Sequence, residues 1–199
     1  MSSLRSGTRE PGVSPKKDNM REALIELVTK HTPFDDTERA HTMSTLEFLH
    51  KNKNCTSAGN LDGHITASAW VLSPQRTETL LTHHGELNRW LQLGGHIEDD
   101  ATIQAAALRE AVEESGIENI HLIEDSIFDI DVHLIPARNE IAEHYHYDIR
   151  FLLQAERTAF VISDESNDLA WVKLTDIGNF VSEESVLRMC RKSKQVDAL

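Results

Sequence analysis

Five segments in the second two-thirds of the chain have the short, largely alternating apolar pattern of β-strands, in which successive side chains point to opposite faces. These segments are 64–72, 78–84, 126–137, 144–156 and 169–177. Residues 101–115 and 182–192 instead space their apolar residues as helices do, with Asp99 or Asp100 and then Ser182 as the expected N-caps. Strands and helices interleave without a regular βαβ rhythm. The pattern therefore predicts an α/β fold with a mixed sheet flanked by helices.

The first 60 residues have a different pattern. Residues 1–17 are rich in Ser, Gly, Pro and charge, which predicts a disordered tail. A helical pattern starts at Asp18 and ends at Pro33, and a second starts after Asp35 or Asp36. Its expected buried positions are Ala40, Met43, Leu46 and Leu49. We predict a helical N-terminal extension over 18–60, placed ahead of a main domain over 61–199.

Composition narrows the classes of function. The chain has 199 residues and a formal net charge of −13, which argues against a partner that is a nucleic-acid polymer. Its two cysteines, Cys55 and Cys190, form no CxxC motif, so a reduced, cytoplasmic setting is expected. No apolar run is long enough to span a bilayer, and no secretory h-region stands near the N-terminus. We predict no membrane partner.

The predicted helix over 101–115 carries Glu110, Glu113 and Glu114 within an arc of roughly 100°. Such like-charged neighbours destabilise a helix by roughly 0.2–0.5 kcal/mol per pair. The face could simply be solvated. However, it has no lysine, and a Gly94-Gly95 turn precedes the helix, where a backbone without Cβ atoms can approach a ligand. Carboxylate oxygens on one face are ligands that Mg²⁺ prefers, and a bound cation would relieve the repulsion.

Residues 95–117, GHIEDDATIQAAALREAVEESGI, resemble the Nudix box, whose pattern is G-x5-E-x7-R-E-U-x-E-E-x-G-U with U an aliphatic residue. The matching positions are Gly95, Arg109, Glu110, Ala111, Glu113, Glu114, Gly116 and Ile117. The resemblance implies a Nudix-type α/β/α sandwich that hydrolyses a nucleoside diphosphate linked to another group X. One position departs: Ala101 stands where the family has its first glutamate, a mainly supportive residue. Glu98, Asp99 and Asp100 are the candidates to take over its role.

The resemblance also implies roles for individual residues. Glu110 and Glu114 would be the main Mg²⁺ ligands, although Mn²⁺ is possible, and Glu113 would add a ligand directly or through water. The Gly94 carbonyl is a further expected ligand, and Arg109 would pair with a neighbouring carboxylate. The catalytic residues would therefore be Arg109, Glu110, Glu113 and Glu114. The general base could be a box glutamate or an acid on a later loop, such as Glu165 or Asp168, although that acidic turn is also typical of plain solvated loop.

The chain contains eleven histidines, and several share strand faces with carboxylates. His144, His146 and Asp148 lie on one face of a predicted strand, and Asp129, Asp131 and His133 on one face of another. If the two strands pair, these groups could form a zinc site, a hydrated polar surface or a wall of the substrate pocket. Trp90 and Tyr145 could stack on a base, although tryptophan is more often core. The candidate substrate-binding residues are Trp90, His96, His133, His144, His146 and Glu165.

Three functions compete on this basis. The leading one is a Mg²⁺-dependent pyrophosphohydrolase whose partner is a small nucleotide-type diphosphate. The second is a Nudix-fold nucleotide-binding or regulatory module with little or no turnover, which the Ala101 departure motivates. The third is a Nudix-fold isomerase of a prenyl diphosphate, which would need a cysteine near its substrate. The N-terminal helices could also form the interface of a homodimer.

Overall fold

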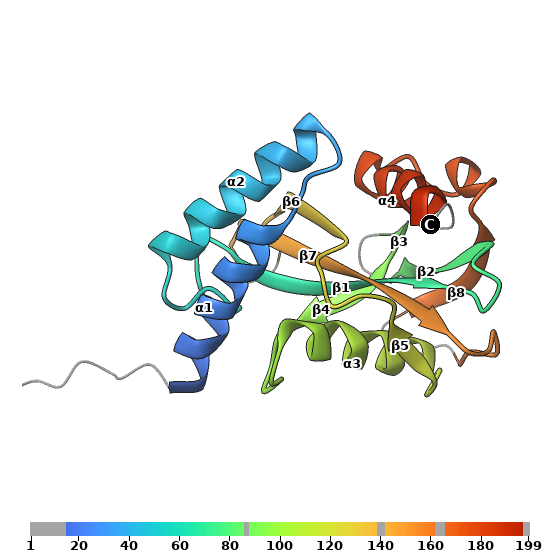
Figure 1. The fold of residues 1–199 in the computed structure, drawn as a ribbon, viewed down its shortest axis with the longest axis horizontal. Helices are drawn as coiled ribbons and strands as arrows, with labels where there is room; N and C mark the ends of the chain where they lie inside the picture. The colour runs from blue at the N-terminus through green and yellow to red at the C-terminus, as the bar shows by residue number, and fades with distance from the viewer. Residues whose placement is uncertain (1–14, 86–87, 139–141, 162–165, 197–199) are drawn as a thin grey trace, which may run out of the picture.

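The structure is a computed structural model that describes residues 15–85, 88–138, 142–161 and 166–196 (Figure 1). Four α-helices and eight strands follow one another in these ranges, with one short 3₁₀ helix. The helices are α1 Pro15–Lys30, α2 Asp36–Lys51, α3 Ile103–Ser115, η1 Ile177–Asn179 and α4 Glu184–Val196. The strands are β1 His64–Leu72, β2 Glu78–His84, β3 Arg89–Leu91, β4 Leu93–His96, β5 Ile120–Leu122, β6 Asp129–Ile135, β7 His144–Ala155 and β8 Ser166–Lys173. No helix in these ranges has the length and apolarity that crossing a membrane requires.

The eight strands form one mixed sheet, as the sequence predicted. Its main path runs β3-β2-β1-β7-β5, with β4 paired to β1, β6 to β7 and β8 to β2. The pairing of β1 with β7 is parallel over the whole of β1, and the remaining pairs are antiparallel. Strands β1 and β7 therefore lie at the centre of the sheet, although 71 residues lie between the end of β1 and the start of β7 in the sequence.

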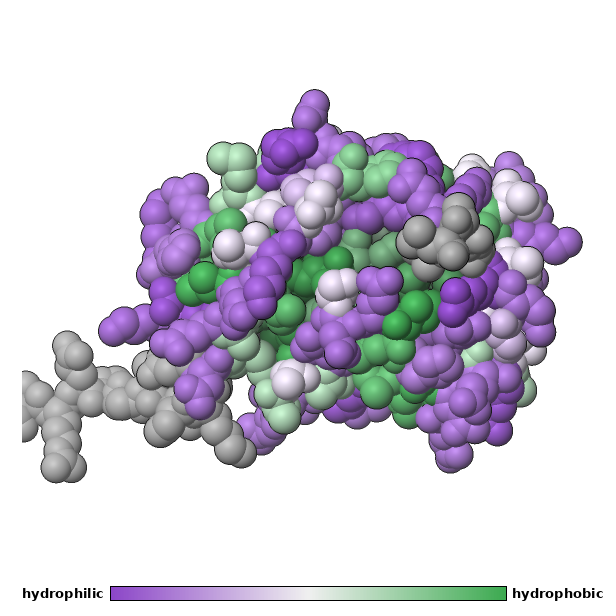
Figure 2. All heavy atoms as spheres, viewed as in Figure 1, coloured by the Kyte–Doolittle hydropathy of each residue, from purple (hydrophilic) through white to green (hydrophobic). Residues whose placement is uncertain are grey.

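Helices lie on both sides of the sheet, which confirms the predicted α/β/α arrangement. Helix α3 lies along one side and α4 along the other in the view of Figure 1, while the α1–α2 pair stands at the left end of the sheet, where α2 contacts β6. Alternate residues of β1 serve the two layers: Ile65, Ala67 and Ala69 join the larger core cluster with α3, and Trp70 and Leu72 join a second cluster with α4. Hydrophilic residues cover much of the face seen in Figure 2, and hydrophobic side chains show between them.

One face of the central strands changes character along its length. Trp70 and Leu72 are apolar, but His64, Thr66 and Ser68 occupy the same face of β1 nearer its start. In the parallel register these three pair with His146, Asp148 and Arg150 of β7. Polar side chains from both strands thus gather at one end of the sheet, where they line a pocket.

The boundaries of the N-terminal helices differ in part from prediction. Helix α1 begins at Pro15 and not at Asp18, which is consistent with proline's fixed φ and the harmless absence of its N–H in a first helical turn. The predicted tail before Pro15 lies outside the described residues. Asp35 is the N-cap of α2, as one of the two alternatives predicted, and its side chain accepts a hydrogen bond from the Glu38 N–H.

The buried face of α2 was predicted correctly at Leu49, which is buried, and at Leu46, which packs against the core, but wrongly at the other two positions. Ala40 and Met43 are exposed, and the buried face instead includes Glu38, Thr42 and Thr45. A charged residue occupies this face because Glu38 is fully paired: it accepts hydrogen bonds from His31, Lys192 and two backbone N–H groups, those of Phe34 and Ile130. Burial alone would raise the pKa of Glu38, but its hydrogen-bond partners hold that pKa at about 2.

Glu38 belongs to a buried ion network that joins the N-terminal helices, the sheet and α4. The network comprises Glu38, Asp129, Asp131, Arg150, Arg188 and Lys192. Asp129 is its centre, because its carboxylate accepts hydrogen bonds from Arg150 at 3.1 Å, Arg188 at 2.8 Å and Lys192 at 3.2 Å. Each charge is paired, which is the condition under which charges are tolerated in a protein interior.

The boundaries of several other elements differ from those predicted. Thr102 and not Asp99 or Asp100 is the N-cap of α3, and its side chain accepts from the Ala105 N–H. Helix α4 begins at Glu184, two residues after the predicted cap Ser182. Strand β8 begins at Ser166, before the predicted start. The sequence pattern missed β3, β4 and β5, because three or four residues are too few for a period of two to show.

Candidate active site

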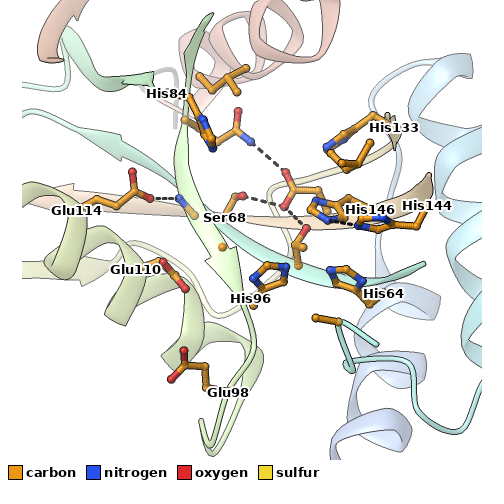
Figure 3. A pocket seen from close by; sticks show the side chains of 18 of the residues that line it. His64, Ser68, His84, His96, Glu98, Glu110, Glu114, His133, His144 and His146 are labelled. Atoms are coloured by element: carbon orange, nitrogen blue, oxygen red, sulfur yellow. Dashed lines mark hydrogen bonds between the residues drawn. The ribbon is translucent and has the colours of Figure 1, made fainter. Parts of the chain in front are cut away.

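The pocket at the polar end of the sheet has a volume of about 790 Å³, which is in the usual range for small-molecule sites. Figure 3 shows Glu98, Glu110 and Glu114 on one side of it and several histidines on the other. The carboxylates come from α3 and the loop before it, while the histidines come from β1, β2, β4, β6 and β7. The pocket therefore has one wall of hard oxygen ligands and another of imidazole rings.

Arg109 organises the carboxylate wall. It forms ion pairs with Glu110 at 3.0 Å and Glu113 at 2.9 Å, and also donates to the His96 carbonyl oxygen at 2.9 Å. Its strongest partner is Asp100, whose two carboxylate oxygens accept from Nε and Nη2 at 3.1 and 3.0 Å. The hydrogen bonds that Arg109 donates to Asp100 are the main cause that raises the pKa of Arg109 above its ordinary value. The guanidinium is therefore always charged.

The bidentate pair with Asp100 explains how the chain accommodates Ala101. Ala101 is exposed and offers no acceptor, but the carboxylate one residue earlier reaches Arg109 in the geometry that guanidinium groups prefer. Partial burial would raise the pKa of Asp100, but the hydrogen bonds that Arg109 donates lower it below its ordinary value. Of the three candidates to support Arg109, the structure therefore selects Asp100.

Two glycines shape the space around the other box glutamates. The Gly94 N–H donates to the Glu114 carboxylate at 2.7 Å, and Glu114 is only 8% exposed. Gly94 has φ of +149°, and a Cβ there would lie 2.3 Å from Ser68 Oγ. At Gly95 a Cβ would lie 2.7–2.9 Å from the carboxylate atoms of Glu110. The two glycines lie within strand β4 and not in the predicted turn, and the strand needs glycine at both positions to lie against the carboxylates of α3.

Asp148 lies between the two walls, with 2% of its surface exposed. Its Oδ1 accepts from Thr66 at 3.0 Å and Ser68 at 2.8 Å, and its Oδ2 accepts from Gln92 at 3.0 Å and Arg150 at 2.7 Å. Burial opposes its ionisation, but the adjacent Arg150 holds the pKa of Asp148 below its ordinary value. Because four donors occupy this carboxylate, Asp148 is poorly suited to accept a proton. Its role in the pocket is to hold the side chains of these donors in place.

Of the six histidines that line the pocket, all but His84 form the opposite wall, and the rings of these five lie close together. His64 is within 4.9 Å of His96, 5.2 Å of His144 and 4.6 Å of His146, measured between ring centroids. His133 is 5.6 Å from His146. Burial, with smaller contributions from neighbouring histidines, lowers the pKa of His64 to about 4 and that of His146 to about 3. These two rings are therefore neutral at neutral pH.

The structure brings most of the predicted site residues to this pocket. These are Gly94, His96, Arg109, Glu110, Glu113, Glu114, His133, His144 and His146. Strands β6 and β7 do pair, which meets the condition set by the sequence, with His133 opposite His146 and Asp131 opposite Asp148. Trp90 does not line the pocket; it packs against the second core cluster beside His83 and Phe180. Tyr145 is exposed on the opposite face of β7.

Of the acids expected on the later loop, Glu165 lies outside the described residues. Asp168 is exposed on β8 opposite His83 and does not line the pocket. Cys55 and Cys190 are both buried in the core clusters, where burial raises the pKa of each thiol, and neither lines the pocket. The pocket therefore lacks the cysteine that the isomerase hypothesis requires.

Several pocket residues were missed by the sequence reasoning, and His64 is the most important of them. His64, Thr66 and Ser68 come from β1, and Gln92 is the residue between β3 and β4; their polar side chains had no obvious partner in sequence. A signal was present in β1: three polar residues occupy alternate positions in a strand that is otherwise apolar. Such a stripe on a fully buried strand indicates a site at one end of it.

Comparison with known proteins agrees with this geometry. The family model for the NUDIX domain matches residues 62–189. The structure of a C. elegans Ap4A hydrolase binary complex has 19% sequence identity and a TM-score of 0.54, and the match covers 67% of this chain and 97% of that one. A NUDIX-family hydrolase from Clostridium perfringens has 22% identity and a TM-score of 0.51, with the same coverage of 67% and 97%. A search of curated proteins finds no match.

The matched segment spans more than half of the chain and contains the whole carboxylate wall. The chain therefore belongs to the NUDIX domain family, the class of the Nudix hydrolases.

Proposed function

We propose that this protein is a divalent-metal-dependent pyrophosphohydrolase that cleaves a nucleoside diphosphate linked to another group X. The observation that carries the proposal is the ordered carboxylate wall, in which Glu110, Glu113 and Glu114 face a pocket of about 790 Å³. Its carboxylates, with Asp100, outnumber the single guanidinium of Arg109 that pairs with them. A negative wall of this kind repels a diphosphate unless a cation lies between them.

The donor set fits Mg²⁺ or Mn²⁺, which prefer oxygen ligands. Glu110, Glu113 and Glu114, with the Gly94 carbonyl, are the groups that would hold the ion, and Gly95 leaves the Glu110 carboxylate the room it occupies. When bound, the metal would polarise the phosphoryl oxygens and lower the pKa of the attacking water.

The residues around the ligands keep them in place. Arg109 restrains Glu110 and Glu113, and Asp100 restrains Arg109 in turn. The Gly94 N–H holds Glu114 against strand β4. Among the acids that the structure describes, Asp148 is saturated by donors and Asp168 lies away from the pocket, and we therefore assign the acceptance of the proton from water to a box carboxylate.

The decisive experiment is a substrate panel in the presence of Mg²⁺ or Mn²⁺. The panel comprises nucleoside triphosphates, ADP-ribose, dinucleoside polyphosphates and sugar nucleotides, and phosphate-containing products are separated by chromatography. We expect metal-dependent release of a nucleoside monophosphate or a phosphomonoester from at least one class. Tight nucleotide binding without turnover, unaffected by loss of the box glutamates, would instead support the binding-module alternative.

Asp100 gives a specific prediction about the Ala101 departure. Asp100→Asn is expected to lower kcat about 10- to 100-fold, in line with the loss of other groups that orient metal ligands, because Arg109 loses its bidentate acceptor. Adding Ala101→Glu in the same chain is expected to restore part of the loss by supplying a carboxylate from the next residue. Steady-state kinetics of both variants check this.

The matched control for Asp100→Asn is Asp99→Asn, an exposed neighbour. Equal losses in the two variants, or an Asp100→Asn enzyme with the full rate, would contradict the supporting role of Asp100.

Gly95→Ala is expected to reduce activity while leaving the fold intact. Its Cβ would overlap the Glu110 carboxylate, which is the flexible end of a side chain and can move aside. Displacement of a catalytic group by about 1 Å can lower the rate about 10²-fold. Kinetics and thermal melting together test the prediction, with Gly178→Ala as the control because no heavy atom lies within 4 Å of that Cβ position. Retention of full activity by Gly95→Ala would show that catalysis does not require the Glu110 carboxylate at its present position.

A further inference from the structure

His64 has no partner for either of its ring nitrogens in the described part of the chain. Its side chain is buried at the start of β1, with 1% of its surface exposed, and neither Nδ1 nor Nε2 makes a hydrogen bond. A neutral imidazole has one donor and one acceptor, and leaving a buried polar group unsatisfied costs roughly 1–3 kcal/mol. Such a group in an otherwise well-paired pocket needs a ligand to explain it.

Two further histidines face the same space. His144 and His146 are two residues apart on β7, so they share one strand face, and the parallel register places His146 directly beside His64. One ligand nitrogen from each of the three rings can be chosen such that all three lie within 4.8 Å of one another. Figure 3 shows the three rings grouped at one side of the pocket, away from Glu110 and Glu114.

The nitrogens of His144 and His146 are already spaced as metal ligands. Their Nε2 atoms are 3.2 Å apart, and two nitrogens bound tetrahedrally at about 2.0–2.1 Å would be separated by about 3.3–3.4 Å. His144 Nδ1 is 2.8 Å from the Ala142 carbonyl oxygen, to which it can only donate. That contact leaves the lone pair on Nε2, and the same contact to a carbonyl is the usual support of a metal-bound histidine.

The other histidines of the wall are placed differently. His133 Nδ1 lies 3.2 Å from an Asp131 oxygen, and 40% of its side chain is exposed. His96 is exposed on β4, although its ring lies 4.9 Å from that of His64. The sequence pattern grouped His133 with His144 and His146, whereas the tertiary structure replaces it with His64.

We propose that His64, His144 and His146 bind one transition-metal ion of the Zn²⁺ type, at a site separate from the box carboxylates. Imidazole nitrogens suit Zn²⁺ and its neighbours, whereas Mg²⁺ takes oxygen ligands. Three histidines leave one or more coordination positions for water or a ligand oxygen in the shared pocket. The pocket thus holds two chemically distinct ion sites, and the ion at the histidine site takes the lone pair of one of the two unpartnered nitrogens of His64.

Titration of the chelator-treated protein with Co²⁺ tests the proposal without reference to hydrolysis. Tetrahedral Co²⁺ bound to nitrogen gives visible absorption, and Zn²⁺ is expected to displace it. We expect one Co²⁺ per chain that gives this absorption, and an affinity for it at least about 100-fold lower in His64→Ala and His146→Ala, since even supporting residues of metal sites contribute 10- to 100-fold. Circular dichroism checks that each variant folds, and His144→Ala, at a less buried position, serves if His64→Ala does not fold.

Two controls separate this site from the rest of the chain. His121→Ala removes an exposed histidine on β5 and should leave Co²⁺ binding unchanged. Glu114→Gln should also retain it, because the box carboxylates are not ligands of this ion. Undiminished binding in His64→Ala, loss of binding in Glu114→Gln alone, or absence of Co²⁺ and Zn²⁺ binding in the unmodified protein would each overturn the proposal. None of these readouts depends on the proposed hydrolase activity.

Discussion

Glu114→Gln is expected to lower kcat roughly 10³-fold, because removing a metal-binding carboxylate forfeits several kcal/mol of transition-state stabilisation. Glutamine has nearly the same shape and can still accept the hydrogen bond that the Gly94 N–H donates at 2.7 Å. The side chain is 8% exposed and lies against strand β4, so the substitution removes charge without opening a cavity. Initial rates with the best substrate of the panel, measured across a range of Mg²⁺ concentrations, provide the test.

The matched control is Glu118→Gln, which changes the same residue type just beyond α3. Its carboxylate is 84% exposed, and its one described partner, Arg157, is 4.0 Å away. This variant should keep the rate of the unmodified protein. A Glu114→Gln enzyme that works at an unchanged rate would disprove the assignment of the box glutamates, whereas a loss shared equally by both variants would point to a general effect of charge.

Asp129→Ala is expected to destabilise the protein by about 3–5 kcal/mol, the range found when one partner of a buried ion pair is removed. Asp129 is fully buried and accepts hydrogen bonds from Arg150, Arg188 and Lys192. Its loss leaves positive charges in the interior without their central acceptor. For a chain of this size, each kcal/mol corresponds to about 2–4 °C in Tm, so a fall of roughly 6–20 °C is expected.

Thermal and urea unfolding of Asp129→Ala should be compared with those of Asp36→Ala. Asp36 is fully exposed and lies 3.5 Å from Arg39 on the surface of α2. A pair of this kind contributes about 0–1 kcal/mol. If both variants melt within 2–3 °C of the unmodified protein, a span that corresponds to about 1 kcal/mol, the network does not stabilise the fold as its geometry implies.

The carboxylate wall was predictable from sequence because its geometry is local. Glu110, Glu113 and Glu114 share one helix, and the helical period alone places their side chains on one face. Gly94 and Gly95 precede that helix closely enough for their role to be inferred as well. The support of Arg109 was only narrowed to three candidates, because the conformation of the loop over 97–102 decides which carboxylate reaches the guanidinium. That loop places Asp100 against Arg109.

The errors on α2 have the same kind of cause. Apolar spacing predicted that Ala40 and Met43 would be buried, but the helix turns Glu38 inward. The pattern of apolar residues in α2 does not indicate that Glu38 is buried, since its partner Lys192 lies 154 residues away on α4. Burial of a charged residue is tolerated only when the fold brings its partners into contact with it. A pattern of hydropathy along the chain contains no information about such contacts.

The sequence by itself determined the five longer strands and the two helices of the main domain, the family to which the chain belongs and the acidic face of α3, because each depends on residues within a few turns or a strand's length of one another. Only the tertiary structure decided that His64 faces His144 and His146, that Asp100 holds Arg109 and that Asp129 joins three cations. These contacts depend on the parallel pairing of β1 with β7 and on the docking of α2 and α4, and such long-range pairings leave no periodic signal in the chain.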